Sequence, residues 1–175
     1  LAERLDARGI RAETITASGF AVGVGACAAI AADLRWVALA GWVANRVLDG
    51  LDGAVARVRG ATDRGGFVDI VADFAVYAGF VLGVACARPD ARLAALFVLG
   101  AYYVSGAAFL AWSSLAERRA RAVADGRSLH FVGGLAEGAE TVVAYALLCI
   151  VPSWTEPILW VFAAMVGVTA LQRVR

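Results

Sequence analysis

The chain has 175 residues and a formal net charge of +1, with 61% hydrophobic and 18% charged residues. With glycine counted and tyrosine omitted, roughly 70% of it is apolar, against about 45–50% in soluble domains. This composition excludes an ordinary soluble protein and predicts a single integral membrane domain over residues 1–175, while the small net charge argues against a nucleic-acid partner.

Runs of about 20 apolar residues predict six transmembrane helices and therefore an all-α, polytopic fold. The predicted spans, which form a six-helix bundle over 15–172, are 15–32, 36–57, 67–86, 92–115, 134–151 and 157–172. Ahead of them, residues 1–14 mix charges with Leu5 and Ile10. This pattern is typical of an amphipathic helix on the membrane surface.

Glycines four residues apart occur in the first and third predicted spans, as Gly19 with Gly23 and as Gly79 with Gly83. Small residues at this spacing let two helix backbones approach closely. The pairs could pack helices within one chain or between two chains, and both interpretations remain open here.

Arginine is unevenly distributed over the predicted connections. Twelve of the sixteen arginines lie in the N-terminal segment, the 57–66 loop, the 116–131 loop and the C-terminal residues. The positive-inside rule places these four segments in the cytoplasm. We therefore expect an integral protein of a bacterial inner membrane, with its two long loops on the cytoplasmic side.

Four aspartates lie in or beside the second and third predicted spans, where a charged side chain at mid-depth costs about 2.5–3.5 kcal/mol. At about 100° per residue, one face of the second helix carries Asp49, Asp52, Gly53 and Ala56. Asp69 and Asp73 lie about 40° apart on the third helix. We expect the two pairs of carboxylates to converge just beneath the cytoplasmic surface.

Four converging carboxylates cannot all remain ionised without cations, because like charges raise one another's pKa. Oxygen ligands select Mg²⁺, Mn²⁺ or Ca²⁺ over zinc, and two such ions about 3.5–4 Å apart can clamp a pyrophosphate. Arg57 adds a guanidinium suited to phosphate, and the loop brings Thr62 and Arg64 to the same rim. Open volume beside the acids is left by the small residues Gly53, Ala56 and Gly65.

The stretch from Asp49 to Asp73 reads D-x-x-D-G-x-x-A-R, seven further residues, and G-x-x-x-D-x-x-x-D. It resembles the signature of the CDP-alcohol phosphatidyltransferase family at all eight defined positions, which are Asp49, Asp52, Gly53, Ala56, Arg57, Gly65, Asp69 and Asp73. The six predicted spans and the cytoplasmic site also resemble this family. The resemblance therefore extends over the whole chain.

The resemblance implies an enzyme that moves a substituted phosphate from a CDP-linked donor to an alcohol and releases CMP, with two bound divalent ions, Mg²⁺ or Mn²⁺. The implied metal ligands are Asp49, Asp52, Asp69 and Asp73. Asp49 and Asp69 would bridge the ions, and Asp73 would also accept the proton of the attacking hydroxyl.

The resemblance also implies the substrates and the residues that contact the donor. Because the protein lies in a membrane, the expected donor is CDP-diacylglycerol and the acceptor is a small polar alcohol. Family members commonly form homodimers. The implied donor contacts are Gly53, Ala56, Arg57, Thr62, Gly65 and Thr16, the last from a segment where the family usually has N-x-x-T and this chain has Glu13 in place of the Asn.

Two other functions remain open at this point. One is a transferase with the opposite donor and acceptor, in which a CDP-linked soluble head group is donated to diacylglycerol. The other is a divalent-cation transporter with acids along its pathway, which does not account for Gly53, Ala56, Arg57 and Gly65.

Three further charged residues have two interpretations each. Arg46, one turn before Asp49, either binds an anionic acceptor or neutralises an acidic neighbour. Glu137 and Glu140 lie near the cytoplasmic end of the fifth predicted span. They either shape the acceptor cavity or pair with Arg46 or with an arginine of the 116–131 loop.

Overall fold

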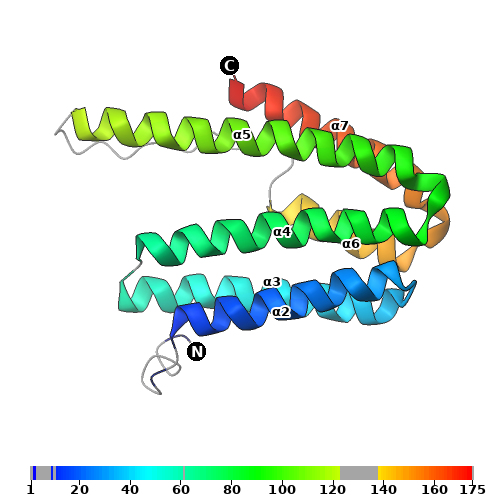
Figure 1. The fold of residues 1–175 in the computed structure, drawn as a ribbon, viewed down its shortest axis with the longest axis horizontal. Helices are drawn as coiled ribbons and strands as arrows, with labels where there is room; N and C mark the ends of the chain where they lie inside the picture. Colours follow the sequence, from blue (N-terminus) through cyan, green and yellow to red (C-terminus); the bar gives the residue numbers. More distant parts are fainter. Residues whose placement is uncertain (1, 3–8, 10, 61, 123–137, 175) are drawn as a thin grey trace.

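A computed structural model describes residues 2, 9, 11–60, 62–122 and 138–174, the side chains of 59 and 116–122 excepted. This part of the chain contains no strand. It forms two 3₁₀ turns, η1 (Pro89–Ala91) and η2 (Pro152–Trp154), and six α-helices (Figure 1): α2 (Ala12–Ala31), α3 (Arg35–Arg59), α4 (Asp63–Ala87), α5 (Arg92–Ala122), α6 (Gly138–Ile150) and α7 (Thr155–Val174). The predicted all-helical class is confirmed.

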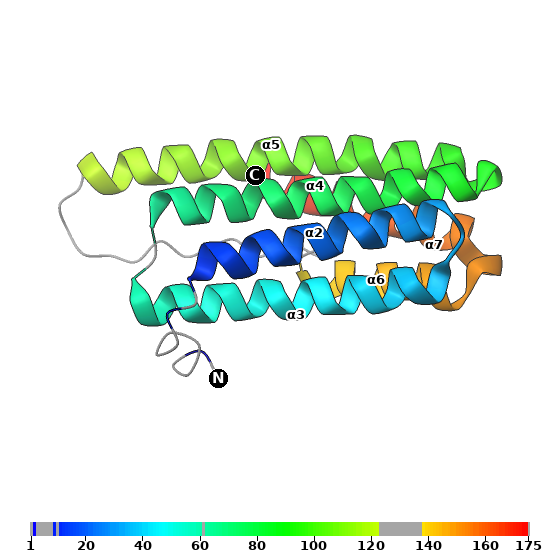
Figure 2. The same ribbon diagram turned by 60° about the horizontal axis from the view of Figure 1, so that its bottom comes forward.

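The helices lie side by side along the long axis of the molecule (Figures 1 and 2). Helix α2 packs against both α3 and α4, α4 packs against α5, and α5 packs against α7, while α6 contacts α3 and α7. The α2–α3, α4–α5 and α6–α7 turns gather at one end of the bundle, and the α3–α4 turn lies at the other (Figure 2). The signature residues therefore belong to the end at which α2 begins.

Four of the helical segments are long and apolar enough to cross a membrane, namely 12–31, 63–87, 89–115 and 152–174. At a rise of 1.5 Å per residue, about 20 residues span the hydrocarbon layer. Helix α3 has 25 residues, but it carries charged side chains along its length, and the described part of α6 has 13 residues. That α3 and α6 also cross the membrane stays a prediction.

Several helix ends differ from those predicted. Helix α2 begins at Ala12 rather than at 15, α4 begins at Asp63 rather than at 67, and α5 continues to Ala122 instead of ending at 115. The predictions marked where apolar residues end, but Ala, Arg and Glu remain strong helix formers outside lipid. The predicted surface helix over 1–14 falls mostly outside the described residues.

The paired glycines pack helices within the chain. A Cβ atom at Gly23 would lie 2.6 Å from a Val76 methyl group, and one at Gly83 would lie 2.7 Å from the Cys27 carbonyl oxygen. Real Cβ contacts are never this short, so only glycine permits α2 to lie this close to α4. Of the two interpretations, packing within one chain accounts for these glycines.

Aromatic side chains fill the centre of the bundle. Trp42, Phe80 and Tyr145 are completely buried, and their ring centroids lie 4.7–5.6 Å apart. Their polar atoms are satisfied, because Trp42 Nε1 donates to the Val142 carbonyl at 3.3 Å and the Tyr145 hydroxyl donates to the Tyr77 carbonyl at 2.9 Å. This cluster ties α3, α4 and α6 together about two turns from Asp49 and Asp73.

Candidate metal centre and substrate cavities

Three of the four aspartates bring their carboxylate oxygens together. Oxygens of Asp49, Asp52 and Asp69 lie within 4.8 Å of one another. Asp52 is 4% exposed, and the other two are half-buried. All three, together with Asp73, line a small interior cavity of about 10 Å³, which holds no more than an atom or two.

The short connection between α3 and α4 sets the distance between these acids. Helix α3 ends at Arg59, and its C-cap is Gly60, whose φ of +101° lies in a region that favours glycine. Thr62 then caps α4 by accepting a hydrogen bond from the Gly65 amide at 3.0 Å. A Cβ at Gly65 would lie 2.9 Å from the Thr62 hydroxyl, so two signature-region residues also shape the start of α4.

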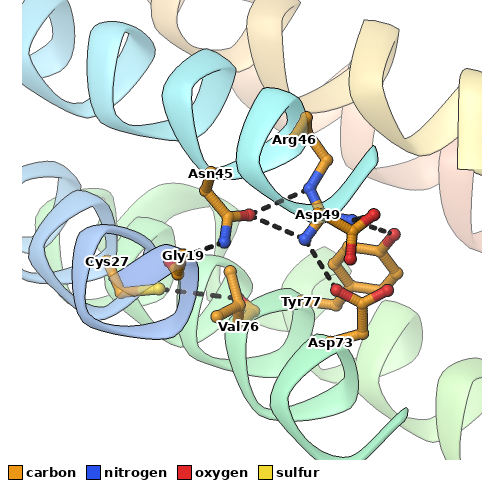
Figure 3. A network of polar contacts seen from close by, with 8 residues as sticks. All are labelled: Gly19, Cys27, Asn45, Arg46, Asp49, Asp73, Val76 and Tyr77. Carbon is orange, nitrogen blue, oxygen red and sulfur yellow. Dashed lines mark hydrogen bonds and ion pairs between the residues drawn. The ribbon is translucent and has the colours of Figure 1, made fainter. Parts of the chain in front are cut away.

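Arg46 occupies the side of the site nearest Asp73 (Figure 3). Its guanidinium donates to Asp73 Oδ1 at 2.7 Å and lies 3.5 Å from Asp49 Oδ2. It also donates to the Tyr77 hydroxyl at 2.7 Å and twice to Asn45 Oδ1, at 2.7 and 2.9 Å. Of the two interpretations of Arg46, neutralisation of acidic neighbours is the one that these contacts favour.

Asn45, Trp42 and Tyr77 support Arg46, and the sequence analysis missed all three. Asn45 is 3% exposed and donates to the Gly19 carbonyl at 2.9 Å, while the Arg46 guanidinium lies 4.9 Å from the ring centroids of Trp42 and Tyr77. Two signals were available: Asn45 is a polar residue within an apolar span, and Tyr77 follows Asp73 at helical i, i+4 spacing.

The residues present suit a divalent cation. Within the described part of the chain, neither Asp52 nor Asp69 forms an ion pair, and Arg46 is the one arginine that pairs with Asp49 and Asp73. Four carboxylates facing a single guanidinium leave a surplus of negative charge in a low-dielectric region. Oxygen ligands of this kind are those that Mg²⁺ and Mn²⁺ prefer.

A larger cavity of about 480 Å³ opens beside the acidic cluster. Its walls include Asp52 and Asp69, Arg11 and Glu13, and all six residues expected to contact the donor: Thr16, Gly53, Ala56, Arg57, Thr62 and Gly65. A Cβ at Gly53 would lie 3.5 Å from the Arg57 guanidinium. The cavity thus combines cations at its rim with carboxylates at one wall. We call it the donor cavity.

The remaining predicted residues lie elsewhere. Glu140 lines a groove between α6 and α7 and not a cavity that contains the aspartates. Arg46 pairs with Asp49 and Asp73 instead of with Glu140. Glu137 lies outside the described residues, and Arg64 is exposed without lining the donor cavity.

Known proteins share this fold. Two crystal structures of Mycobacterium tuberculosis phosphatidylinositol phosphate synthase PgsA1 superpose with TM-scores of 0.75. The one with CDP-DAG bound is 22% identical, and the alignment covers 99% of this chain and 89% of PgsA1. The one in complex with manganese and citrate is 20% identical, with 99% and 85% covered. At these identities the likeness shows a common fold.

A bacterial relative has a more similar sequence than PgsA1 has. Inner membrane protein YnjF of Escherichia coli strain K12 is 40% identical over 176 residues, which cover 97% of this chain and 84% of YnjF. The sequence profile of the CDP-alcohol phosphatidyltransferases matches residues 10–171. The protein is therefore a member of the CDP-alcohol phosphatidyltransferase family.

Proposed function

We propose that this protein transfers the phosphatidyl group of CDP-diacylglycerol to a small polar alcohol and releases CMP. The observation that carries the proposal is the junction of the acidic cluster with the donor cavity. Asp52 and Asp69 belong to both, so a diphosphate bound in the cavity would have its phosphorus atoms next to the carboxylates.

The donor's nucleotide and diphosphate would occupy the donor cavity. Arg57 and Arg11 supply charge for phosphate there. The two glycines and Ala56 keep the helix backbones accessible, because larger side chains would fill the same space. The acyl chains would remain among the helices, four of which are long and apolar enough to cross a membrane.

Two divalent ions, Mg²⁺ or Mn²⁺, would be held by Asp49, Asp52 and Asp69, with Asp73 proposed as a fourth ligand. When bound, they would neutralise the diphosphate and the charge that develops on CMP. The PgsA1 complex with manganese supports this choice of ion. The surplus of carboxylates around Arg46 supports it independently.

Asp73 is the proposed general base. Its Oδ1 is held by Arg46 at 2.7 Å, and within the described residues its Oδ2 accepts no hydrogen bond. Oδ2 would accept the proton of the acceptor hydroxyl while that oxygen forms a bond to the phosphatidyl phosphorus. The bond from phosphorus to the CMP oxygen breaks in the same step, and CMP leaves with the electron pair.

The position in the membrane follows from arginine distribution. Arg11 and Arg57 mark the end of the bundle at which the donor cavity opens. By the positive-inside rule this end faces the cytoplasm, where CDP-linked substrates are available, and the membrane is proposed to be the bacterial inner membrane. A homodimer is the expected assembly, since family members commonly pair.

The proposal is tested with purified protein in lipid nanodiscs containing CDP-diacylglycerol. With Mn²⁺ and a panel of alcohols, we expect CMP release that matches the formation of a new phospholipid. A parallel assay supplies CDP-linked alcohols and diacylglycerol instead. CMP release in that assay alone would show that the protein donates a CDP-linked head group to diacylglycerol. Flux of Mn²⁺ across liposomes without any nucleotide would favour a transporter.

A further inference from the structure

The four aspartates of the acidic cluster differ in the partners they have. Oxygens of Asp49, Asp52 and Asp69 lie within 4.8 Å of one another, and none of the described arginines pairs with Asp52 or Asp69. Asp73 is not a member of this group of three, and its Oδ1 lies 2.7 Å from the Arg46 guanidinium. One side of a site proposed to hold two divalent ions therefore already contains a cation of the protein.

The Arg46 guanidinium bridges the carboxylates of Asp49 and Asp73 (Figure 3). Its Nη2 lies 2.7 Å from Asp73 Oδ1, and its Nη1 lies 3.5 Å from Asp49 Oδ2. A divalent ion that shared these two carboxylates would approach the same oxygens, because Mg²⁺ and Mn²⁺ take carboxylate oxygen as ligand. The guanidinium and a second ion therefore compete for Asp49 and Asp73.

Neutral partners fix Arg46 in this position. Its Nε and Nη2 both donate to Asn45 Oδ1, and its Nη1 donates to the Tyr77 hydroxyl. The side chain is 11% exposed, and the rings of Trp42 and Tyr77 lie against the guanidinium. All of these partners belong to α3 and α4, so the packing of the two helices places this cation beside the acids.

Charge balance distinguishes the first ion from the second. Four carboxylates and one guanidinium carry a formal charge of −3 when all five are ionised, and one divalent ion reduces it to −1. A second ion would reverse the sign, in a region where like charges repel strongly. The donor's diphosphate, esterified at both ends, brings one negative charge on each phosphate and restores the original surplus. Only then does the site attract a second ion as it attracted the first.

The donor cavity reaches the acidic cluster from the side of the first ion. Its walls include Asp52 and Asp69, and neither Asp73 nor Arg46 contributes to them. A diphosphate in this cavity therefore adds its charge next to the group of three carboxylates. Asp49 is the residue that belongs to this group and also pairs with Arg46.

We infer that Arg46 takes the place of a second divalent ion in the protein without substrate, so that Asp49, Asp52 and Asp69 hold a single ion until the donor binds. Asp73 accepts a second ion only when the diphosphate supplies the negative charge that Arg46 otherwise balances. The inference rests on the proposed function, and it adds an order of binding that the function does not require. Arg46 is a positioning residue, because it acts through Asp49 and Asp73.

The test counts the Mn²⁺ ions that each chain binds, from the electron paramagnetic resonance signal of the Mn²⁺ that stays free. The unaltered protein is placed in phosphatidylcholine nanodiscs, with and without CDP-diacylglycerol and without any acceptor alcohol. Protein-free nanodiscs of the same lipid composition give the background. We expect one ion per chain without CDP-diacylglycerol and two with it. Two ions or none without it, or a single ion with it, would overturn the inference.

Variants of Arg46 assign the effect to its charge. Arg46→Met should bind two ions without CDP-diacylglycerol, with the affinity for the second raised more than about tenfold. The repulsion between a unit charge and a divalent ion about 4 Å apart corresponds to such a change even in water. Arg46→Lys keeps a cation and should again bind one ion, as should the control Arg35→Met at the other end of α3. A single ion in Arg46→Met without the donor would contradict the role given to Arg46.

Asp73→Asn locates the second ion. With CDP-diacylglycerol this variant should bind one ion instead of two, because the group of Asp49, Asp52 and Asp69 is unchanged. Two ions in Asp73→Asn would place the second one away from Asp73 and contradict the inference. If Arg46→Met does not fold, the counts in the unaltered protein and in Asp73→Asn still decide the matter.

Failure of this inference can be told apart from failure of the proposed function. Counting Mn²⁺ requires no transfer reaction, and CMP release with a panel of alcohols requires no count. CMP release by a protein that binds two ions before the donor would overturn the inference alone. Counts of one and two without CMP release from any alcohol would contradict the proposed function and leave the role of Arg46 standing.

Discussion

Arg46 and Asp73 form the closest ion pair of the described residues, with 2.7 Å between the guanidinium nitrogen and Oδ1. The arginine side chain is 11% exposed and the aspartate 31%. This contact makes the four acids unequal, because Asp73 has a protein cation as partner whereas Asp52 and Asp69 have none among the described residues. It distinguishes Asp73, the proposed base, from Asp52 and Asp69, whose charge a bound metal ion would have to balance.

Replacing Arg46 with methionine tests this division. The variant leaves Asp73 without its arginine partner in a half-buried place, so we expect a loss of about 1–3 kcal/mol in stability without metal. A divalent ion should compensate, because it neutralises the same group of acids. Thermal unfolding in detergent should therefore show a larger increase in Tm with Mn²⁺ for Arg46→Met than for the unaltered protein.

Arg35→Met is the matched control for that experiment, since it removes an exposed arginine from the other end of the same helix. It should change neither the Tm nor the response to Mn²⁺ appreciably. An Arg46→Met variant that loses equal stability with and without Mn²⁺ would show that Arg46 acts only in packing against Trp42 and Tyr77.

The buried carboxylate of Asp52 should dominate metal binding. In Asp52→Asn, one of the three converging carboxylates becomes a neutral amide. We therefore expect the affinity for Mn²⁺ to fall at least about tenfold, as when other metal-site residues are changed. Titration followed by electron paramagnetic resonance measures this affinity. Asp63→Asn removes an exposed acid from the first turn of α4 and should leave the affinity unchanged.

Chelation by EDTA should abolish both CMP release and the Mn²⁺-dependent binding of CDP-diacylglycerol, and added Mn²⁺ should restore both. The reason is that the cluster's surplus charge opposes a diphosphate unless a cation lies between them. Activity that persists in EDTA at full rate would remove the basis for the metal assignment of Asp49, Asp52 and Asp69.

Asp73→Asn separates chemistry from donor binding. The amide keeps the shape of the side chain but cannot accept the proton, so turnover should fall by about 10²- to 10⁴-fold. Binding of CDP-diacylglycerol with Mn²⁺, measured by equilibrium dialysis in nanodiscs, should change much less. CMP release at the normal rate by this variant would exclude Asp73 as the base.

The helical class and the convergence of the acids could be predicted because both depend on local patterns. Apolar runs identify the helices, and the i, i+3 and i, i+4 spacings place Asp49 with Asp52 and Asp69 with Asp73. Helix ends were less accurate, since hydropathy reports where lipid ends and not where the helix does. Helix α5, which continues to Ala122, illustrates the difference.

The partners of single charged residues could not be predicted in the same way. Whether Arg46 meets Asp73 or an acceptor depends on how α3 faces α4, and Arg173 meets Ser105 from 68 positions away. Both contacts are set by packing between helices that hydropathy does not encode. The glycines at 23 and 83 determine that packing, but their spacing alone does not name the helix they face.

Gly83 provides the last test, which concerns the packing that sets the distance between α2 and α4. In Gly83→Ala the new Cβ would lie 2.7 Å from a backbone carbonyl oxygen of α2, which cannot rotate away as a side chain can. We expect a loss of about 1–3 kcal/mol, as for other overpacked sites, with weaker Mn²⁺ binding because the acids on α4 shift relative to those on α3. Gly25→Ala is the control, since nothing lies within 4 Å of its Cβ and alanine favours a helix by up to about 1 kcal/mol. Equal Tm values for the two variants would show that α2 and α4 can separate without cost.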